Sequence, residues 1–113
     1  MKGTNLGELE ELILLTVANL KSEAYGLSIR DFIKNRCERS VSISTVHATI
    51  HRLEDKGFLS SEYDNSSATE RGGRPKLVFS ITSAGHAAIT TARDQRNDLW
   101  NTIPSLSFNT ADL

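Results

Sequence analysis

The sequence contains a single cysteine, Cys37, so no disulfide framework can form within the chain. A lone cysteine is usually a small buried hydrophobic residue, and a reactive or metal-binding thiol is the alternative. The longest apolar run, Leu12 to Leu15, is far too short to cross a membrane. The first residues also lack a basic and then apolar leader. We therefore expect a protein of the reducing cytoplasm that makes no contact with a membrane.

Motifs that support catalysis or cofactor binding are also missing. The sequence has no GxSxG nucleophile elbow, no phosphate-binding loop and no CxxC pair. None of the three histidines is paired with an obvious nucleophile. These absences favour a binding protein over an enzyme, and we expect no catalytic residues, no cofactor and no resident metal.

A large excess of charge of one sign is missing as well, since the net charge at pH 7 is −1. Nucleic-acid-binding proteins usually have a more positive balance. The charges are unevenly distributed, however. Residues 1–25 have a net charge of −2, whereas residues 26–58 have six basic and four acidic side chains, a net charge of +2. A dimer can build a basic face from such middle segments.

Three helices are predicted in the first half of the chain. Apolar residues recur with helical spacing over residues 6–20, over residues 24–37 and over a third segment that ends near Lys56. Ser42 or Ser44 can cap this third helix with its hydroxyl oxygen, and Gly57 is a typical residue just after a helix end.

A hairpin and a fourth helix follow. Residues 58–63 and 76–82 are rich in β-forming side chains and flank a polar loop, which predicts two strands joined by a long turn. Ser83 is expected to cap a helix that extends to about Ile103, just before Pro104.

This order of elements is that of a winged helix-turn-helix. We expect a mainly α-helical fold with a small antiparallel β wing. The predicted division is a DNA-binding domain at residues 1–82, a dimerisation helix at 83–104 and a disordered tail at 105–113.

Two apolar helix faces predict a homodimer. Helix 6–20 has one stripe that includes Ile13 and Val17, and Leu14 and Leu15 lie off it, so more than one side needs cover. A second subunit can cover it, or the last helix of the same chain. That last helix has an apolar seam in alternating steps of four and three, interrupted by Arg96, which either fixes register or reaches solvent. The predicted dimer contacts are Leu14, Leu15, Ile89, Ala92, Arg96, Leu99, Trp100 and Ile103.

Trp100 is the only tryptophan and allows two interpretations. Packing in the dimer interface is the favoured one. The alternative is a flat wall of an effector pocket, against which a hydrophobic or aromatic small molecule stacks.

The third predicted helix has a polar face opposite its apolar seam. In a helix-turn-helix this helix enters the major groove of DNA, where hydroxyl, imidazole and guanidinium groups can contact base edges and phosphates. A small residue at position 48 would let the helix sit deep in the groove. The predicted DNA contacts on this helix are Ser44, Thr45, His47, Ala48, His51 and Arg52. An ordinary solvated face is the alternative.

The second candidate for DNA contact is the loop before the second strand. Its glycines keep the backbone slim, and its basic side chains suit the negative potential of a minor groove. The predicted contacts here are Arg71, Gly73, Arg74 and Lys76. A flexible charged loop tip is the alternative.

A metal site on the third helix is a competing idea. His47 and His51 are four residues apart, with Glu54 near the same face, and this spacing can hold a divalent cation. The pattern lacks the glutamate of a HExxH motif, and no fourth ligand is evident, so we disfavour the idea.

Four segments together resemble the PadR family of bacterial transcriptional regulators. They are LGELEELILL at 6–15, AYGLSIRDFI at 24–33, STVHATIHRLEDKGFL at 44–59 and ERGGRPKLVFSITSAG at 70–85. The resemblance covers about Leu6 to Ile89. It implies a winged helix-turn-helix that binds operator DNA as a homodimer, usually as a repressor that a small molecule releases. It also implies that the last helix packs on the partner, often against its first helix, as in the compact branch of the family. His47 stands where family members commonly have tyrosine.

The sequence thus predicts a sequence-specific DNA-binding transcriptional regulator. Two other functions are kept open: a winged helix used for protein–protein contact, and a metal- or redox-responsive regulator that uses His47, His51 or Cys37.

Overall fold

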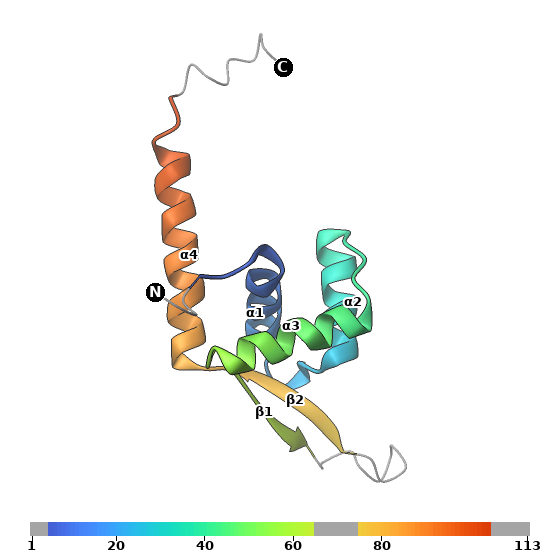
Figure 1. Ribbon diagram of the computed structural model, residues 1–113. Coiled ribbons are helices and arrows are strands. Elements are labelled where there is room, and N and C mark those ends of the chain that lie inside the picture. Colours follow the sequence, from blue (N-terminus) through green and yellow to red (C-terminus); the bar gives the residue numbers. More distant parts are fainter. Residues whose placement is uncertain (1–4, 65–74, 105–113) are drawn as a thin grey trace.

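The computed structural model describes residues 5–64 and 75–104. Its elements, in chain order, are α1 (Glu8–Leu20), the short 3-10 helix η1 (Lys21–Glu23), α2 (Gly26–Cys37), α3 (Ile43–Asp55), β1 (Leu59–Asp64), β2 (Lys76–Ile81) and α4 (Ser83–Asn101). The predicted fold of three helices, a β-hairpin and a further helix is confirmed (Figure 1). The expected tail at 105–113 lies outside the described residues.

Hydroxyl caps set where two of the helices begin. Ser42 Oγ accepts a hydrogen bond from Thr45 N at 3.1 Å, so Ser42 is the cap of α3. Thr82 Oγ1 accepts from Gly85 N at 3.0 Å, so Thr82 caps α4 and the expectation of Ser83 is wrong by one residue.

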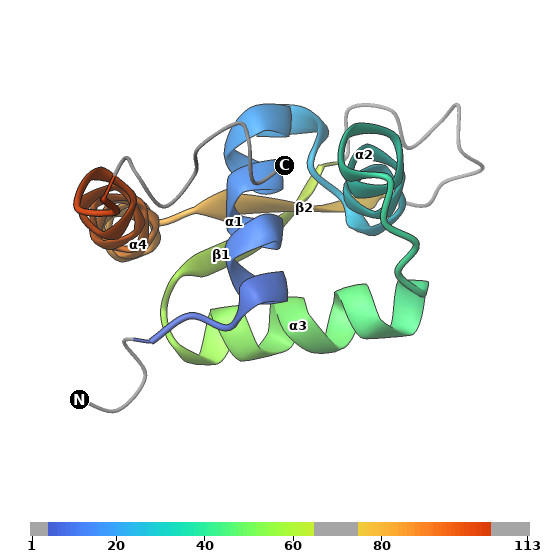
Figure 2. The same ribbon diagram turned by 90° about the horizontal axis from the view of Figure 1, so that it is seen from above.

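The core lies where α1, α2 and α3 meet above the hairpin. Its fully buried side chains are Ile13, Leu14, Val17, Ile29, Ile33, Val46, Ile50 and Leu53. Figures 1 and 2 show α3 crossing α1 and α2, with α2 and α4 on opposite sides of α1. Burying each such aliphatic side chain stabilises the fold by about 1.5–3 kcal/mol, and this packing fixes the direction of α3.

Two expectations about buried and exposed residues are wrong. Leu14 was expected at a dimer face, but none of its surface is exposed, because the contact of α1 with the other helices covers it within one chain. Cys37 was expected to be buried and is exposed, because it is the last residue of α2 and lies beyond the core.

The hairpin is antiparallel and in register from the Leu59–Ile81 pair to the Asp64–Lys76 pair. Its buried side chain Phe79 belongs to the core, and Phe79 N donates a hydrogen bond to Ala24 O at 2.8 Å. This main-chain bond fixes the second strand of the wing to the segment between α1 and α2.

The base of α4 is held tightly against the hairpin. A Cβ atom added at Gly85 would overlap the carbonyl oxygen of Phe58, and Thr82 Oγ1 donates to Gly57 O at 2.7 Å. Gly85 is therefore buried against its own chain. Further along, α4 departs from the helical body (Figure 1). Its residues 93–101 are exposed. No helix in the part of the chain that the structure describes is long and apolar enough to span a membrane.

Candidate nucleic-acid interface

Helix α3 presents one polar face to solvent along its whole length. Its inner positions Val46, Thr49, Ile50 and Leu53 are buried. The six residues predicted to contact DNA on this helix are all exposed: Ser44, Thr45, His47, Ala48, His51 and Arg52. The sequence thus produces a rigid helix with one face fixed in the core and the other free for contact.

The hydroxyl groups at the start of α3 form a connected set. Ser42 Oγ lies 3.1 Å from Ser44 Oγ and donates to Thr45 Oγ1 at 2.9 Å. Because these hydroxyl groups already have neighbours, their positions are restricted before any ligand arrives. Donors and acceptors held in this way suit contact with base edges or phosphates.

The two histidines of α3 have different surroundings. A Cβ at Gly26 would lie only 2.9 Å from Cε1 and Nε2 of His47, so the imidazole of His47 lies directly over the glycine that starts α2. His51 Nδ1 lies 3.6 Å from Glu54 Oε1 at the surface. In the described ranges 5–64 and 75–104, no group of three or more His, Cys, Asp or Glu side chains gathers in metal-binding geometry.

The end of α3 is braced by a buried carboxylate of α1. Glu10 is only 6 % exposed, and its Oε1 accepts from Lys56 Nζ at 2.8 Å and from Gly7 N at 2.7 Å. Its other oxygen lies 3.7 Å from Arg52 Nε. Arg52 Nη2 also donates to Thr49 Oγ1 at 3.1 Å, so one side of this guanidinium is held while the side chain stays more than half exposed.

These contacts decide the ionisation of Glu10. Burial raises the pKa of the carboxyl group, but the hydrogen bonds from Lys56 and Gly7 and the charges of Lys56 and Arg52 outweigh it. The pKa of Glu10 therefore falls below its ordinary value of 4.5. Glu10 is ionised at neutral pH and supplies a fixed negative charge behind the polar face of α3.

The wing contributes one predicted contact to the described residues. Lys76 starts β2, and its Nζ lies 4.2 Å from the centre of the Tyr25 ring. Arg71, Gly73 and Arg74 lie outside the described residues.

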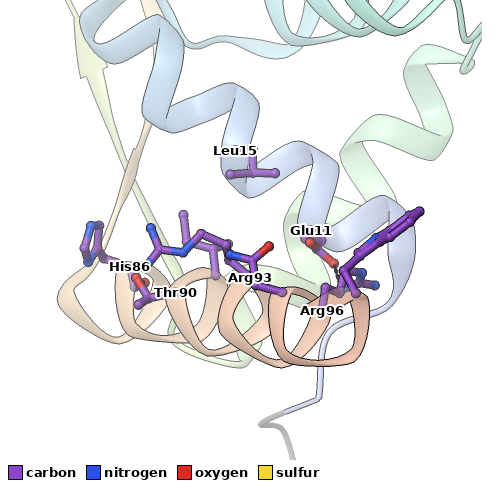
Figure 3. A pocket seen from close by; sticks show the side chains of 9 residues that line it. Glu11, Leu15, His86, Thr90, Arg93 and Arg96 are labelled. Atoms are coloured by element: carbon purple, nitrogen blue, oxygen red, sulfur yellow. Dashed lines mark hydrogen bonds and ion pairs between the residues drawn. The ribbon is translucent and has the colours of Figure 1, made fainter. Parts of the chain in front are cut away.

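Large apolar side chains of α1 and α4 are also exposed. Leu15, Leu99 and Trp100 are 41 %, 66 % and 68 % exposed. Ile89, Ala92 and Ile103 are half-buried. A cleft of about 370 Å³ lies between the two helices, with Leu15 and Glu11 on α1 facing His86, Thr90 and Arg93 on α4 (Figure 3).

Arg96 does not simply extend into solvent. Its Nη1 lies 2.8 Å from Glu11 Oε1, and this ion pair connects the middle of α4 to the first turn of α1 (Figure 3). The charged interruption of the apolar seam is therefore explained by a contact within one chain.

Reasoning from the sequence missed Glu10, Glu11 and Tyr25. The spacing of Gly7 and Glu10 could have indicated the first of these, because a glutamate three residues after a helix cap often reaches back to the cap nitrogen. Helical periodicity gives no signal for the other two, since their partners Arg96 and Lys76 are distant in sequence.

Comparison with known proteins supports a regulator. A crystal structure of a PadR family transcriptional regulator from Eggerthella lenta is 25 % identical over 90 % of this chain and 88 % of its own, with a TM-score of 0.66. A PadR-like transcription factor from Bacteroides fragilis is 25 % identical over 83 % and 84 % of the two chains, with a TM-score of 0.67. A PadR family regulator from Clostridium difficile, at 24 % identity over 80 % and 91 % and a TM-score of 0.60, shares the fold. The search of curated proteins found no match.

Residues 13–91 match the family described as the transcriptional regulator PadR-like family. That range includes the core of the helical body, the whole polar face of α3, both wing strands and the base of α4. The family and the structural relatives are transcriptional regulators rather than enzymes. The chain therefore belongs to the PadR-like family and is a DNA-binding transcriptional regulator.

Proposed function

We propose that this regulator is a cytoplasmic homodimeric repressor that binds a pseudo-palindromic operator and is released by a small molecule. The observation that supports it best is the polar face of α3, which is exposed along its length beside the wing. In the proposed complex the two α3 helices enter successive major grooves, about 34 Å apart.

In this proposal, sequence is read by the first turns of α3. Ser44, Thr45, His47 and His51 are the proposed base contacts, beside the small Ala48. Each good contact of this kind contributes roughly 1–3 kcal/mol of discrimination. Arg52 and the wing residues Arg71, Gly73, Arg74 and Lys76 are proposed to meet phosphates or a flanking minor groove, which adds affinity that falls with salt.

The dimer is proposed to form through the segment 83–104, which contains α4, against α1 of the partner. Exposed large apolar side chains are candidates for an interaction surface, and Leu15, Leu99 and Trp100 are all exposed in the single chain. Ile89, Ala92 and Ile103 extend it along α4, with Arg96 at its edge. Leu14 is not part of this proposal, because it is buried within its own chain.

The cleft between α1 and α4 is the proposed effector pocket. Trp100 and Leu15 offer it apolar surface, and its volume of about 370 Å³ suits a small hydrophobic or aromatic molecule. An effector releases DNA only if it binds one arrangement of the two reading helices more tightly than the other.

Fluorescence anisotropy tests the proposal. The purified protein is titrated into DNA from upstream of its own gene and into a scrambled duplex, across a salt series. Tight, salt-dependent binding with a preference for the upstream DNA is expected. Weak and equal binding would place the operator elsewhere, and no binding to either duplex at low salt would favour a protein–protein role.

A further inference from the structure

A carboxylate and an imidazole lie next to each other on the outer surface of α3. His51 Nδ1 lies 3.6 Å from Glu54 Oε1, three residues further along the helix. This separation is within the range of an ion pair and is longer than an ordinary hydrogen bond. The imidazole side chain is 76 % exposed, whereas the carboxylate side chain is only 27 % exposed. The carboxylate therefore lies beneath an imidazole that remains accessible to a ligand.

The carboxylate of Glu54 is also held by the wing. Ser61 Oγ on β1 donates a hydrogen bond to Glu54 Oε2 at 2.9 Å. The backbone of Ser61 is fixed in turn, because it pairs across the hairpin with Phe79, a buried residue of the core. One oxygen of Glu54 is thus bound by the strand and the other lies beside the imidazole, so the side chain is restricted before any DNA arrives.

The basic side chains near this pair have other partners. Arg52 Nε lies 3.7 Å from Glu10 Oε2, and Arg52 Nη2 donates to Thr49 Oγ1 at 3.1 Å. Among the residues that the structure describes, no lysine or arginine forms an ion pair with Glu54. The negative charge of Glu54 therefore acts mainly on the ring of His51.

A fixed carboxylate beside Nδ1 affects which ring nitrogen carries the proton of a neutral imidazole. Neutral imidazole has one N–H donor and one acceptor nitrogen, and its neighbours select between the two forms. A negative charge 3.6 Å from Nδ1 of His51 favours the form with the proton on Nδ1. Nε2, the other ring nitrogen, is then left as a hydrogen-bond acceptor.

We propose that Glu54 is a positioning residue that keeps the proton of neutral His51 on Nδ1, so that Nε2 accepts a hydrogen bond from an exocyclic amino group of DNA. In the major groove these donors are N6 of adenine and N4 of cytosine. The opposite form of the ring would present a donor and would select acceptors such as N7 and O6 of guanine. The inference rests on the proposed DNA-binding function and adds to it the kind of base group that His51 reads.

The position of the proton is measured first, without DNA. Long-range 1H–15N NMR spectra distinguish a protonated ring nitrogen from an unprotonated one, and they are recorded at about pH 8.5, where neutral imidazole prevails. The chain has three histidines, so the signals missing from His51→Ala identify those of His51. We expect a protonated Nδ1 in the wild type, and Glu54→Gln should shift the proton toward Nε2, the form that a free histidine side chain prefers in water. Asp55→Asn removes the same charge from the exposed next residue and is the matched control, which should keep the wild-type spectrum.

The base group is then tested by analogues in DNA. Sites selected from a random duplex pool by the wild type and by His51→Ala differ at the base pair that His51 reads. At this pair the amino-bearing base is replaced by an analogue without the amino group, purine for adenine or 2-pyrimidinone for cytosine. The wild type should lose affinity roughly 5- to 150-fold beyond the loss of His51→Ala, which measures the effect of the analogue on the duplex itself. Glu54→Gln should lose much less than the wild type, and Asp55→Asn should lose as much.

The two measurements separate the ways in which the proposal can fail. A proton on Nε2 in the wild type, or a Glu54→Gln spectrum equal to that of the wild type, removes the positioning role of Glu54. If Glu54→Gln does not fold, the wild-type spectrum alone decides that role. Equal losses of affinity in the wild type and His51→Ala remove the reading of an amino group. If the wild type binds no DNA at all, the proposed function itself fails and the reading of a base fails with it, whereas the spectra still decide the role of Glu54.

Discussion

Glu10 of α1 accepts a hydrogen bond from Lys56, the residue that follows α3, across a Nζ–Oε1 distance of 2.8 Å. The contact joins the beginning of the first helix to the end of the reading helix. Lys56 Nζ also donates to Asn5 O at 2.9 Å, so one ammonium group holds the approach to α1 as well. The face of α3 that meets solvent is thereby fixed from behind at its far end.

Replacing this carboxylate is expected to weaken the fold. Glu10→Gln keeps the shape of the side chain but removes the charge that Lys56 and Arg52 share, and we expect a loss of about 1–3 kcal/mol in the free energy of unfolding. Urea denaturation at pH 7 measures it. Glu8→Gln is the matched control, since Glu8 pairs with Arg39 at the surface and should change stability by less than about 1 kcal/mol. Equal losses of unfolding free energy in the two variants would show that the buried ion pairs of Glu10 stabilise the fold no more than a surface ion pair does.

Acidic pH should remove the stabilisation that the ionised carboxylate of Glu10 provides. Because the pKa of Glu10 is lowered in the folded state, the stability it provides is present above the pKa of the unfolded chain and is lost as pH falls through the folded pKa. We therefore expect the difference in unfolding free energy between wild type and Glu10→Gln to shrink below about pH 4.5. Denaturation curves from neutral to acidic pH test this, and a difference that stays constant would contradict it.

His47→Ala is expected to alter sequence discrimination more than affinity. A lost base contact lowers the preference for operator over scrambled DNA by roughly 1–3 kcal/mol, whereas affinity for scrambled DNA changes little. Competition anisotropy with the two duplexes measures the ratio. His86→Ala, on α4, is the control and should leave the ratio unchanged. Equal losses of affinity for both duplexes would show that His47 contributes to DNA binding without reading the sequence.

Leu99→Glu is expected to separate the proposed dimer. Leu99 is 66 % exposed in one chain, and a charge placed there would be buried without a partner in the interface. Sedimentation equilibrium gives the mass, and Trp100 fluorescence should shift to the red as the ring becomes hydrated. Leu27→Glu, at another exposed leucine on α2, should leave the mass of the assembly unchanged. If the Leu99→Glu protein keeps the assembly mass of the wild type, the dimer interface does not include Leu99.

Gly85→Ala is expected to destabilise the protein, although helix propensity alone predicts that it stabilises it. In an exposed helix this change stabilises by up to about 1 kcal/mol. Here the new Cβ would overlap Phe58 O and lie 2.9 Å from Ile81 Cγ1, so we expect a loss of about 1–3 kcal/mol. Thermal unfolding monitored by circular dichroism measures it, with the exposed Ser83→Ala as control. A raised melting temperature would show that the base of α4 is not tightly packed.

Periodicity and turn residues were sufficient to predict the fold. The apolar spacing of Val46, Ile50 and Leu53 defined the inner side of α3, and Gly57 marked its end. Both signals are local, so they are visible in one sequence. The same spacing placed His47 and His51 on the exposed side of that helix.

Contacts between distant residues could not be predicted in this way. Leu14 and Leu15 are equally apolar, yet Leu14 is buried in the core of the chain, whereas Leu15 lines the open cleft between α1 and α4 and is 41 % exposed. Arg96 was predicted to fix register in a dimer or to reach solvent, and its ion pair with Glu11 was not foreseen because Glu11 lies on another helix. Tertiary packing, which the sequence pattern does not contain, decided both outcomes.

Because Gly85 is tightly packed at the base of α4, a small tilt of the helix there produces a large displacement at its far end. A helix of 19 residues is about 28 Å long, so a tilt of about 10° at its base displaces its far end by about 5 Å. Thr82 and Gly85 hold the base of α4 in place, and the Arg96–Glu11 ion pair holds the helix further along its length. A molecule that breaks the Arg96–Glu11 ion pair would therefore displace Trp100 by several ångströms while the packing at Gly85 stays in place.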